Sequence, residues 1–411
     1  MTEPIETLTI EGFAGIESLE IQTRPFTVLI GPQSVGKSIA AKLLFFFKNA
    51  PRVLYLEALQ DSEQSASETL LEYFAKILPS PTHSKGAATI TYLRDSAKFT
   101  LHHDGSENGS WEITMPVALR QAFRRLKSEL EEEEDGDESI YESNVLAKDA
   151  YRGRIRKLWE DADVWPRFVP AGRSFYSQIE RDPASYYEAA ALDPFVTEFA
   201  KFLATIKGRS RLRHVLDSSD TAAALCEELL SGRYERDGND EFIHSVDGRR
   251  LPPRLWSSGQ QEAQPLTLLL QRYSQGFFSP TCLFVEEPEA HLFPASQRVI
   301  TELIALTHNA RQPGMQMFLT THSPYILSTV NNLLLAGQLH KKSKTPKQKG
   351  VLQRIVPQDR SLPPGSVGAF YMDRTGCKSI LDPKTGLIDS NAIDEVSGSL
   401  NQQFDCLLDL S

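Results

Sequence analysis

The sequence predicts an α/β protein with an N-terminal antiparallel β-meander, a parallel core sheet and a helical insertion. Apolar and β-branched segments at Leu8–Ile10, Ser18–Ile21 and Phe26–Ile30 are separated by glycine and proline, which predicts two strands of a meander followed by a strand that leads into a glycine-rich loop. Two later apolar runs, Thr281–Val285 and Met315–Leu319, end at polar residues and are typical of strands buried in a parallel sheet. The stretch between these two ends of the chain is patterned mainly as helices.

Three regions are expected along the chain. Residues 1–115 form an N-terminal lobe, residues 116–215 a helical insertion or lid with an acidic loop, and residues 216–411 a C-terminal lobe. The expected helices are Ser38–Lys48, Ala66–Leu78, Val117–Glu134, one from Pro194, Glu262–Tyr273 and a terminal helix up to Leu410. The expected strands are Ala88–Leu93, Lys98–His102, Gly109–Thr114 and a hairpin within Gly368–Leu387. The polar, basic segment Lys341–Lys349 is expected to be a flexible exposed loop.

Composition and charge narrow the class of protein. Hydrophobic residues make up 40% and charged residues 24% of 411 residues, as in ordinary globular proteins. The formal net charge of −10 argues against a globally basic nucleic-acid binder, and part of it comes from the acidic run Glu129–Glu138, expected to be a solvated loop. No apolar run is long enough to cross a membrane, and no secretory signal is expected at the start.

The cysteines and the aromatic helix face are expected to be structural. The four cysteines have no paired spacing, which favours a reducing cytoplasm over a zinc site or disulfides: Cys226, Cys282, Cys377 and Cys406. A further apolar helix face is expected to be core and no cofactor site, and consists of Phe195, Phe199, Phe202, Leu203 and Ile206.

Residues Gly31–Ser38, GPQSVGKS, match the phosphate-binding pattern GxxxxGK[ST] between a predicted strand and a predicted helix. Backbone N–H groups of such a loop and the helix N-terminus hold phosphate. Lys37 is expected to reach the β- and γ-phosphates of ATP, and Ser38 to ligate Mg²⁺. The other residues expected around the nucleotide are Gly31, Pro32, Gln33, Ser34, Gly36 and Ile39.

Three further groups are expected at the same site. Glu286 and Glu287 follow a buried strand, so Glu286 is placed to hold Mg²⁺ and Glu287 to polarise the attacking water. His322 falls just past the next strand, where a neutral histidine can bond the γ-phosphate and orient water. The segment Ser257–Gln260 precedes a leucine-rich helix and forms a second anion-binding element, or alternatively an ordinary helix cap.

Together these sequence motifs resemble those of ABC-type ATPase heads, in the branch that contains SMC proteins, RecF-like repair ATPases and the OLD family. Residues 6–38 resemble the start of that branch. EEPEAHLFP at Glu286–Pro294 resembles its EEPExHLHP motif, LTTHSP at Leu319–Pro324 its His switch, and WSSGQQ at Trp256–Gln261 its LSGGQ signature. VPAGRS at Val169–Ser174 resembles the "IPA-x-R" strand of OLD-like ATPases.

The resemblance implies roles for particular residues. It makes Glu287 the general base, His322 the switch, and Ser257, Gly259 and Gln260 contacts to the γ-phosphate of a partner's ATP. It makes Arg173 a nucleotide-interface residue and Gln178 a weak candidate for the Q-loop glutamine. The chain departs from the pattern in three places, which could slow turnover: Gln33 for Asn, Glu286 for Asp and Trp256 for Leu.

The resemblance also implies partners. No TOPRIM nuclease pattern follows His322, so the chain is expected to be an ATPase without its own nuclease, similar to sensor subunits of anti-phage systems such as the PARIS type. It would form a homodimer or higher oligomer, control a separate nuclease or toxin effector, and respond to a phage protein or DNA.

Two other classes remain open. A RecF-like repair ATPase is suggested by three basic clusters, in residues 120–127, 152–157 and 207–213, although ordinary surface solubility explains each cluster as well. A P-loop kinase or transporter subunit is disfavoured by EEPEAHLFP and by the lack of a membrane segment.

Overall fold

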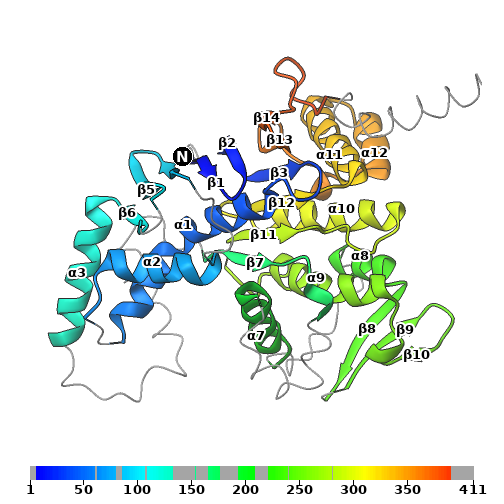
Figure 1. Cartoon of the computed structure of the whole chain (residues 1–411). Coiled ribbons are helices and arrows are strands. Elements are labelled where there is room, and N and C mark those ends of the chain that lie inside the picture. The colour runs from blue at the N-terminus through cyan, green and yellow to red at the C-terminus, as the bar shows by residue number, and fades with distance from the viewer. Residues whose placement is uncertain are drawn as a thin grey trace, which may run out of the picture.

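A computed structural model of the chain describes residues 6–60, 63–79, 86–106, 109–132, 153, 165–175, 193–208, 221–238, 240–279 and 281–389. Its strands form three sheets (Figure 1). The central sheet has the order β14-β13-β3-β12-β11-β7, in which the five strands from β13 to β7 run parallel and β14 pairs with β13 antiparallel. These strands are β3 (Phe26–Ile30), β7 (Arg167–Val169), β11 (Cys282–Glu286), β12 (Gln316–Thr321), β13 (Val367–Asp373) and β14 (Gly376–Ser379).

The other two sheets are antiparallel. The first has the order β2-β1-β4-β5-β6 and contains the predicted meander, whose strands are β1 (Glu6–Phe13), β2 (Ile16–Thr23), β4 (Ala88–Arg94), β5 (Ala97–His103) and β6 (Glu112–Thr114). The second has the order β10-β9-β8 and projects from the lower part of the molecule in Figure 1, with strands β8 (Gly232–Asp237), β9 (Asp240–Ser245) and β10 (Arg250–Leu251). The α/β fold class with antiparallel and parallel sheets is thus confirmed.

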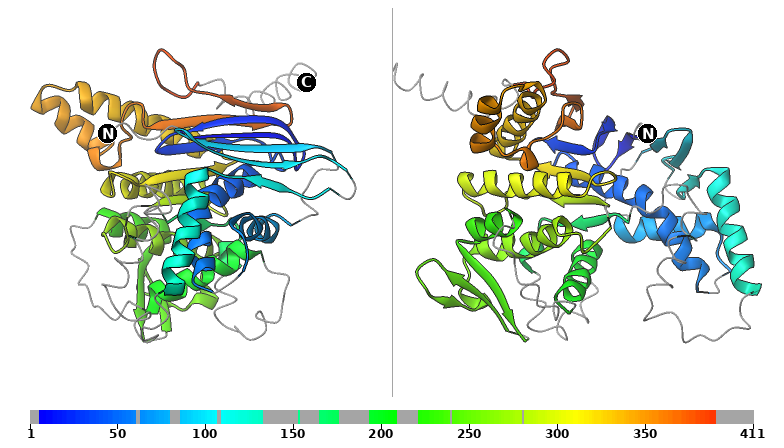
Figure 2. Two further views of the ribbon diagram at one scale, coloured as in Figure 1. Left: turned by 90° about the vertical axis from the view of Figure 1, so that its left-hand side faces the viewer. Right: turned by 180° about the vertical axis from the view of Figure 1, so that it is seen from behind.

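The helices pack on both faces of the central sheet (Figure 2). Their bounds are α1 (Lys37–Ala58), α2 (Ala66–Ile77), α3 (Val117–Glu132), α7 (Pro194–Gly208), α8 (Thr221–Leu230), α9 (Ser258–Ser274), α10 (Pro294–Ala310), α11 (Pro324–Lys342) and α12 (Pro346–Ile355). Short 3₁₀ turns lie at η3 (Arg173–Phe175), η5 (Pro253–Leu255) and η6 (Gln358–Arg360). Among these described helices, none combines the length and apolar character that crossing a bilayer requires.

Two hydrophobic cores lie on opposite faces of the central sheet, because successive side chains of a strand alternate in direction. Phe284 of β11 faces the core shared with α1 and the meander, whereas Leu283 and Val285 face the core shared with α9, α10 and α11. The sequence shows continuous apolar runs here because strands buried on both faces need them.

The predicted aromatic face of α7 is core. Phe195, Phe199, Leu203 and Ile206 are buried, while Phe202 is partly buried beneath the Arg167 guanidinium, 4.1 Å from its ring centroid. Cys226 and Cys282 are buried and Cys377 is partly buried, and the Cys226 thiol donates to the Thr267 carbonyl at 3.8 Å. Burial raises the pKa of Cys282 to about 12, which keeps this thiol protonated.

One element differs from its prediction. The segment Lys341–Lys349, expected to be a loop, contains the last residues of α11 and the first residues of α12, joined by Ser343–Thr345. Thr345 caps α12 by accepting from the Gln348 N–H, and Pro346 occupies the first turn, so cap chemistry outweighs the polar composition that suggested a loop. The expected exposure of the segment is correct.

Several predictions lie outside the described residues. They concern Gln178, the terminal helix up to Leu410, the basic residues of the cluster at 152–157, and most of the basic residues predicted at 207–213. Most of the acidic run Glu129–Glu138 also lies outside, apart from the end of the α3 backbone.

Candidate nucleotide site

The phosphate loop connects β3 to α1, as predicted. Lys37 opens α1, and its buried ammonium donates to the carbonyls of Gly31 at 2.7 Å and Pro32 at 2.5 Å. Burial lowers the pKa of Lys37, and the nearby carboxylates of Glu287 and Glu289 partly offset this shift. The ammonium therefore lies within the electrostatic reach of the loop that follows β11.

Glycine is required at two positions of the loop for different reasons. Gly36 has a φ of 103°, a left-handed conformation that only glycine adopts readily. A Cβ on Gly31 would lie 1.9 Å from the carbonyl oxygen of Met372 in β13, so the close approach of a neighbouring strand excludes any side chain. Pro32, Gln33, Ser34 and Ser38 are exposed, and Ile39 is partly buried in the first turn of α1.

Glu286 ends β11 and faces the phosphate loop. Strand β12 lies between β3 and β11, yet the Ser38 hydroxyl lies close enough to the Glu286 carboxylate to act on its pKa. The carboxylate also accepts from the Ala171 N–H at 3.3 Å. Burial raises the pKa of Glu286, against the lowering effects of Ser38, Lys42 and Ala171. Its Oε1 atom is buried and has no hydrogen-bond partner among the described residues.

These features fit a magnesium ion carried with a nucleotide. In the described part of the chain, no group of three or more His, Cys, Asp and Glu could hold a metal alone. A hydroxyl and one carboxylate beside a phosphate loop are the limited donor set that Mg²⁺ uses when phosphates and waters supply its other ligands. Ser38 and Glu286 would hold the ion, and a cation there would supply the partner that Glu286 Oε1 lacks.

Glu287 and His322 face each other from adjacent strand ends. Glu287 has a φ of 41°, and its N–H donates to the carbonyl of Thr320 at 2.8 Å, which turns the chain sharply after β11. The Nδ1 atom of His322 lies 3.8 Å from Glu287 Oε1, and both side chains are partly exposed. A left-handed non-glycine residue costs of order 1–3 kcal/mol and is typical of functional sites.

Glu289 connects the ends of β11 and β12, and no role was predicted for it from the sequence. Its buried Oε1 accepts from the Thr321 hydroxyl at 2.6 Å and from the His322 N–H at 2.9 Å, and lies 3.4 Å from His322 Nδ1. Its Oε2 is buried without a hydrogen-bond partner among the described residues. Its position in the EEPEAHLFP motif was the one sequence feature that could have pointed to Glu289. Only the pairing of β11 with β12 shows which residues it contacts.

Arg173 supports this loop from behind. Its side chain is fully buried and donates to the carbonyls of Glu286 at 2.9 Å, Glu287 at 3.0 Å and Glu262 at 3.1 Å. Burial lowers the pKa of Arg173, and the surrounding carboxylates, Glu262 foremost, oppose that shift. The guanidinium is enclosed by protein, and the expected place of Arg173 at the nucleotide interface stays a prediction. Its hydrogen bonds hold the carbonyls of Glu286 and Glu287.

The signature element lies at the N-terminus of α9. Ser257 and Gln260 form a capping box: the Ser257 hydroxyl accepts from the Gln260 N–H at 3.2 Å, and Gln260 Oε1 accepts from the Ser257 N–H at 2.9 Å. Gln260 also donates to the carbonyl of Leu230. A Cβ on Gly259 would lie 3.1 Å from the carbonyl of His291, so the element packs on the loop after β11. It forms no hydrogen bond with the described residues 31–38.

The structure therefore brings together Lys37, Ser38, Glu286, Glu287 and His322 at one edge of the central sheet. It places Ser257, Gly259 and Gln260 beside the loop after Glu287 and apart from the phosphate loop of the same chain. Gln297 of α10 links these parts, since it donates to the Leu292 carbonyl at 2.9 Å and accepts from the Ser323 hydroxyl at 2.5 Å.

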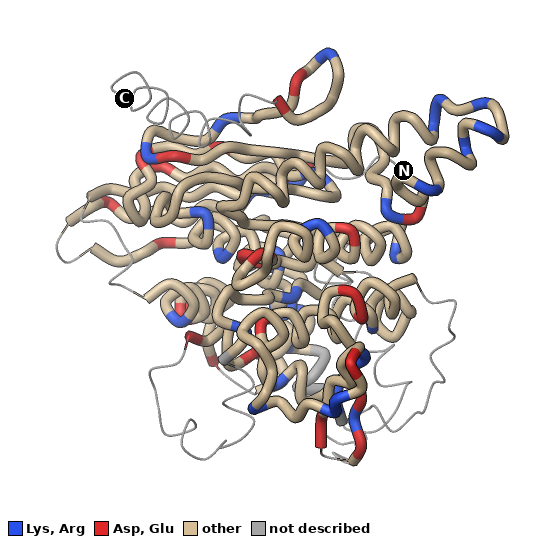
Figure 3. The backbone as a smooth tube through the Cα atoms, turned by 90° about the vertical axis from the view of Figure 1, so that its right-hand side faces the viewer, with Lys and Arg blue, Asp and Glu red and all other residues tan. Residues whose placement is uncertain are grey.

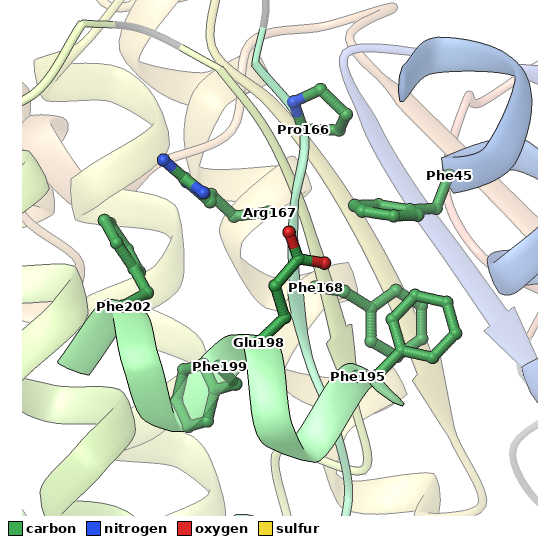
Figure 4. A pocket seen from close by; sticks show the side chains of 8 residues that line it. All are labelled: Phe45, Pro166, Arg167, Phe168, Phe195, Glu198, Phe199 and Phe202. Atoms are coloured by element: carbon green, nitrogen blue, oxygen red, sulfur yellow. The ribbon is translucent and has the colours of Figure 1, made fainter. Parts of the chain in front are cut away.

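A separate pocket beneath β7 does not carry the chemistry. It is lined by Phe45, Pro166, Arg167, Phe168, Phe195, Glu198, Phe199 and Phe202 (Figure 4). Its cavity volume of about 20 Å³ is comparable to the space that one water needs. It is a packing gap between aromatic rings.

Comparisons with known proteins agree with an ATPase. Over residues 26–328 the chain matches the family described as "AAA domain, putative AbiEii toxin, Type IV TA system". No curated protein matches the chain.

The similar solved structures include heads of SMC proteins. The SMC head domain from Thermotoga maritima is 13% identical, with 79% of this chain and 91% of that chain covered, at a TM-score of 0.36. An SMC head bound to the C-terminal winged-helix domain of ScpA is 11% identical, with coverage of 92% and 96%, at 0.41. A head with an extended coiled coil, bound to the C-terminal domain of ScpA from Pyrococcus furiosus, is 12% identical, with coverage of 96% and 98%, at 0.40. At these identities the similarity concerns the fold alone.

Proposed function

The chain belongs to the AAA-domain family of the AbiEii type, and on that premise we propose that it is an oligomeric ATPase that hydrolyses ATP at a site shared between two chains. The observation that carries the proposal is the convergence of Lys37, Ser38, Glu286, Glu287 and His322 at the carboxyl ends of β3, β11 and β12. Ligands bind at this edge of open α/β sheets.

The residues divide the chemistry between them. Lys37 leaves the Gly31 and Pro32 carbonyls to contact the β- and γ-phosphates of ATP, where a fixed positive charge stabilises the charge that develops during transfer. Magnesium, held by Ser38 and Glu286, supplies charge neutralisation at the phosphate oxygens. Glu287 accepts the proton of the attacking water, and His322, held by Glu289, orients that water and senses the γ-phosphate.

The shared site is inferred from the signature element. Its Ser257 and Ser258 side chains are exposed at a helix N-terminus, where the helix dipole favours an anion. No hydrogen bond links this signature element to the described phosphate loop, residues 31–38, of its own chain. A second chain that presents its phosphate loop to this surface would place the γ-phosphate between Lys37 of one chain and Ser257, Gly259 and Gln260 of the other.

The proposal is tested with the Glu287→Gln variant. We expect its turnover, measured by phosphate release, to fall by about 10²–10⁴, because the general base is lost while ATP still binds. ATP should convert this variant from monomer to dimer in light scattering. Lys37→Ala should lose ATP binding, and Glu17→Gln, an exposed meander position, should behave as the wild type.

Two results would separate the parts of the proposal. If ATP-bound Glu287→Gln stays monomeric, the shared site fails while the ATPase stands. If Glu287→Gln releases phosphate at the wild-type rate, the assignment of the general base fails.

Beyond ATP turnover, we propose that the chain is a cytoplasmic sensor or scaffold that controls a separate effector in anti-phage defence. This role is supported by the family description, which names a toxin of a toxin–antitoxin system, and by the ATPase motifs of the chain. A nuclease or toxin gene beside this reading frame would support it. Neighbouring recombination genes would favour the alternative, a RecF- or SMC-like repair ATPase, which the basic residues of α3 also favour.

A further inference from the structure

Helices α11 and α12 form a hairpin at one corner of the molecule (Figures 1 and 2). The His340 side chain bonds the Val356 carbonyl at 2.9 Å and so joins the end of α11 to the end of α12. Every residue of α12 is at least partly exposed. The two helices are therefore held together as one folded unit. The outer surface of this hairpin packs on no described part of the chain.

The hairpin carries several positive side chains and no negative one. Its six exposed cations are Lys341, Lys342, Lys344, Lys347, Lys349 and Arg354. No Asp or Glu occurs between Ser323 and Gln358, although the whole chain has a net charge of −10. None of the six forms an ion pair with a described residue. Figure 3 shows blue Lys and Arg positions gathered along this hairpin and few red ones beside them.

Helix stability accounts for only part of this charge. Lys341 and Lys342 lie in the last turn of α11, where cations stabilise the helix dipole. Lys347 and Lys349 lie in the first turn of α12, where the same dipole makes cations unfavourable and where no acidic residue is present. Folding alone would favour Asp or Glu at these positions, so the lysines at the start of α12 indicate an anionic partner.

We propose that the α11–α12 hairpin binds the phosphate backbone of nucleic acid, with double-stranded DNA as its partner. Exposed lysines on a projecting helix pair suit phosphate contacts, which depend on charge and are independent of sequence. The α12 N-terminus adds backbone N–H groups next to Lys347, as helix N-termini do at phosphates. No aromatic side chain accompanies the lysines between Lys341 and Arg354, which favours a duplex over stacked single strands.

The hairpin has a direct connection to the nucleotide site. Helix α11 begins at Ser323–Pro324, immediately after His322, and its 19 residues end at the basic tip. At about 1.5 Å per residue the helix spans about 28 Å. A duplex held at Lys341–Lys349 is thereby joined through one rigid helix to the His322 switch, which gives DNA a physical route to affect ATP turnover.

The test compares two triple variants of the full chain. Lys344→Gln, Lys347→Gln and Lys349→Gln remove charge from the hairpin, while Lys76→Gln, Lys98→Gln and Lys384→Gln remove the same charge from exposed positions elsewhere. Binding of a fluorescently labelled mixed-sequence DNA duplex is measured by anisotropy over a range of salt concentrations, without nucleotide. This measurement is independent of the proposed ATPase cycle, which phosphate release tests without DNA.

We expect the hairpin variant to bind duplex at least about tenfold more weakly, with the slope of log K against log salt reduced in magnitude by about 2–3, as for the loss of three phosphate contacts. The control variant should keep most of the wild-type affinity. Thermal melting and DNA-free ATPase rates of both variants should match the wild type, since neither set lies in the nucleotide site.

Three outcomes would overturn the proposal. The wild type could fail to bind duplex even at low salt, or the hairpin and control variants could lose affinity equally. Alternatively, polyglutamate at the same charge concentration could displace the duplex as well as unlabelled duplex does, which would make the partner an acidic protein.

Discussion

The loop that follows β11 and the N-terminus of α9 carry most of the predicted chemistry, and they are held in opposite ways. The Glu286–Glu289 loop is fixed by long-range contacts: buried Arg173 donates to its carbonyls, and Glu289 accepts from the Thr321 hydroxyl and the His322 N–H. The Ser257–Gln260 segment satisfies its polar groups mainly within one helical turn.

This difference indicates what each region needs from its surroundings. The loop is complete within one chain, so changes behind it should affect both stability and turnover. The α9 N-terminus is stable by itself and exposed, so changes there should affect turnover only when a second chain uses it. Four predictions test this contrast, from the largest expected effect to the smallest.

Replacing Arg173 should have the largest effect. Arg173→Met removes the ion-pair partner of the buried Glu262 carboxylate and the donor to the carbonyls of Glu262, Glu286 and Glu287. We expect a loss of about 3–5 kcal/mol in the free energy of unfolding. Urea unfolding measures the loss, and ATP turnover should fall with it. Arg167→Met, at a partly buried arginine in β7, should cost stability while the folded fraction keeps its turnover. Equal turnover in the two variants would contradict the positioning role of Arg173.

Glu289→Gln should separate orientation from stability. The amide can still accept one hydrogen bond, but it places an NH₂ group where the second carboxylate oxygen lies, and His322 loses its anionic neighbour. We expect turnover to fall by about 10- to 100-fold, as for a misplaced catalytic group, with ATP binding nearly unchanged. The matched change Glu302→Gln, at a largely buried carboxylate paired with Arg298 and Arg360, should leave turnover intact.

Ser257→Ala probes the exposed region. Loss of the cap should cost about 1 kcal/mol of stability, and turnover should drop at least tenfold if the hydroxyl contacts a partner's nucleotide. The chain contains a matched control, because Ser65 and Glu68 form the same capping box on α2. Ser65→Ala should cost similar stability and leave turnover unchanged. If both variants keep full turnover, Ser257 is only a helix cap.

Glu286→Gln changes the residue of the loop that is proposed to hold Mg²⁺, and it should give the smallest change in stability. Burial raises the pKa of Glu286 above its ordinary value of 4.5, so the metal-free fold is stabilised by the neutral form and loses that stability as the pH rises. At neutral pH without Mg²⁺, Glu286→Gln should therefore melt about 1–3 °C higher. The difference should shrink near pH 4, and a variant that melts lower at both pH values would contradict this account.

Much of the site could be predicted from local sequence. The pattern GPQSVGKS and the apolar strands before Glu286 and His322 located the phosphate loop and two strand ends, because motifs and strands are set by neighbouring residues. The role of Arg173 could not be predicted, because burial depends on α9 packing over the loop. Glu289 was missed for the same reason, since its partners Thr321 and His322 lie more than thirty residues further along the chain.

The basic segment Lys341–Lys349 shows how composition can mislead. Its polar residues suggested a loop, but Thr345 and Pro346 begin a helix, and α11 gives that helix a neighbour. Composition correctly indicated exposure, whereas the helical conformation depended on capping and on the packing of the two helices.

The sequence by itself determined that the chain has a phosphate loop, two acidic residues after a buried strand and a histidine after the next strand. These features rest on local pattern and covalent order. Only the tertiary structure decided that β12 lies between β3 and β11, that Arg173 is enclosed behind Glu286 and Glu287, and that Glu289 holds His322. Strand order and burial result from packing the whole chain around the two cores, so residues distant in sequence fix the geometry at which the local motifs meet.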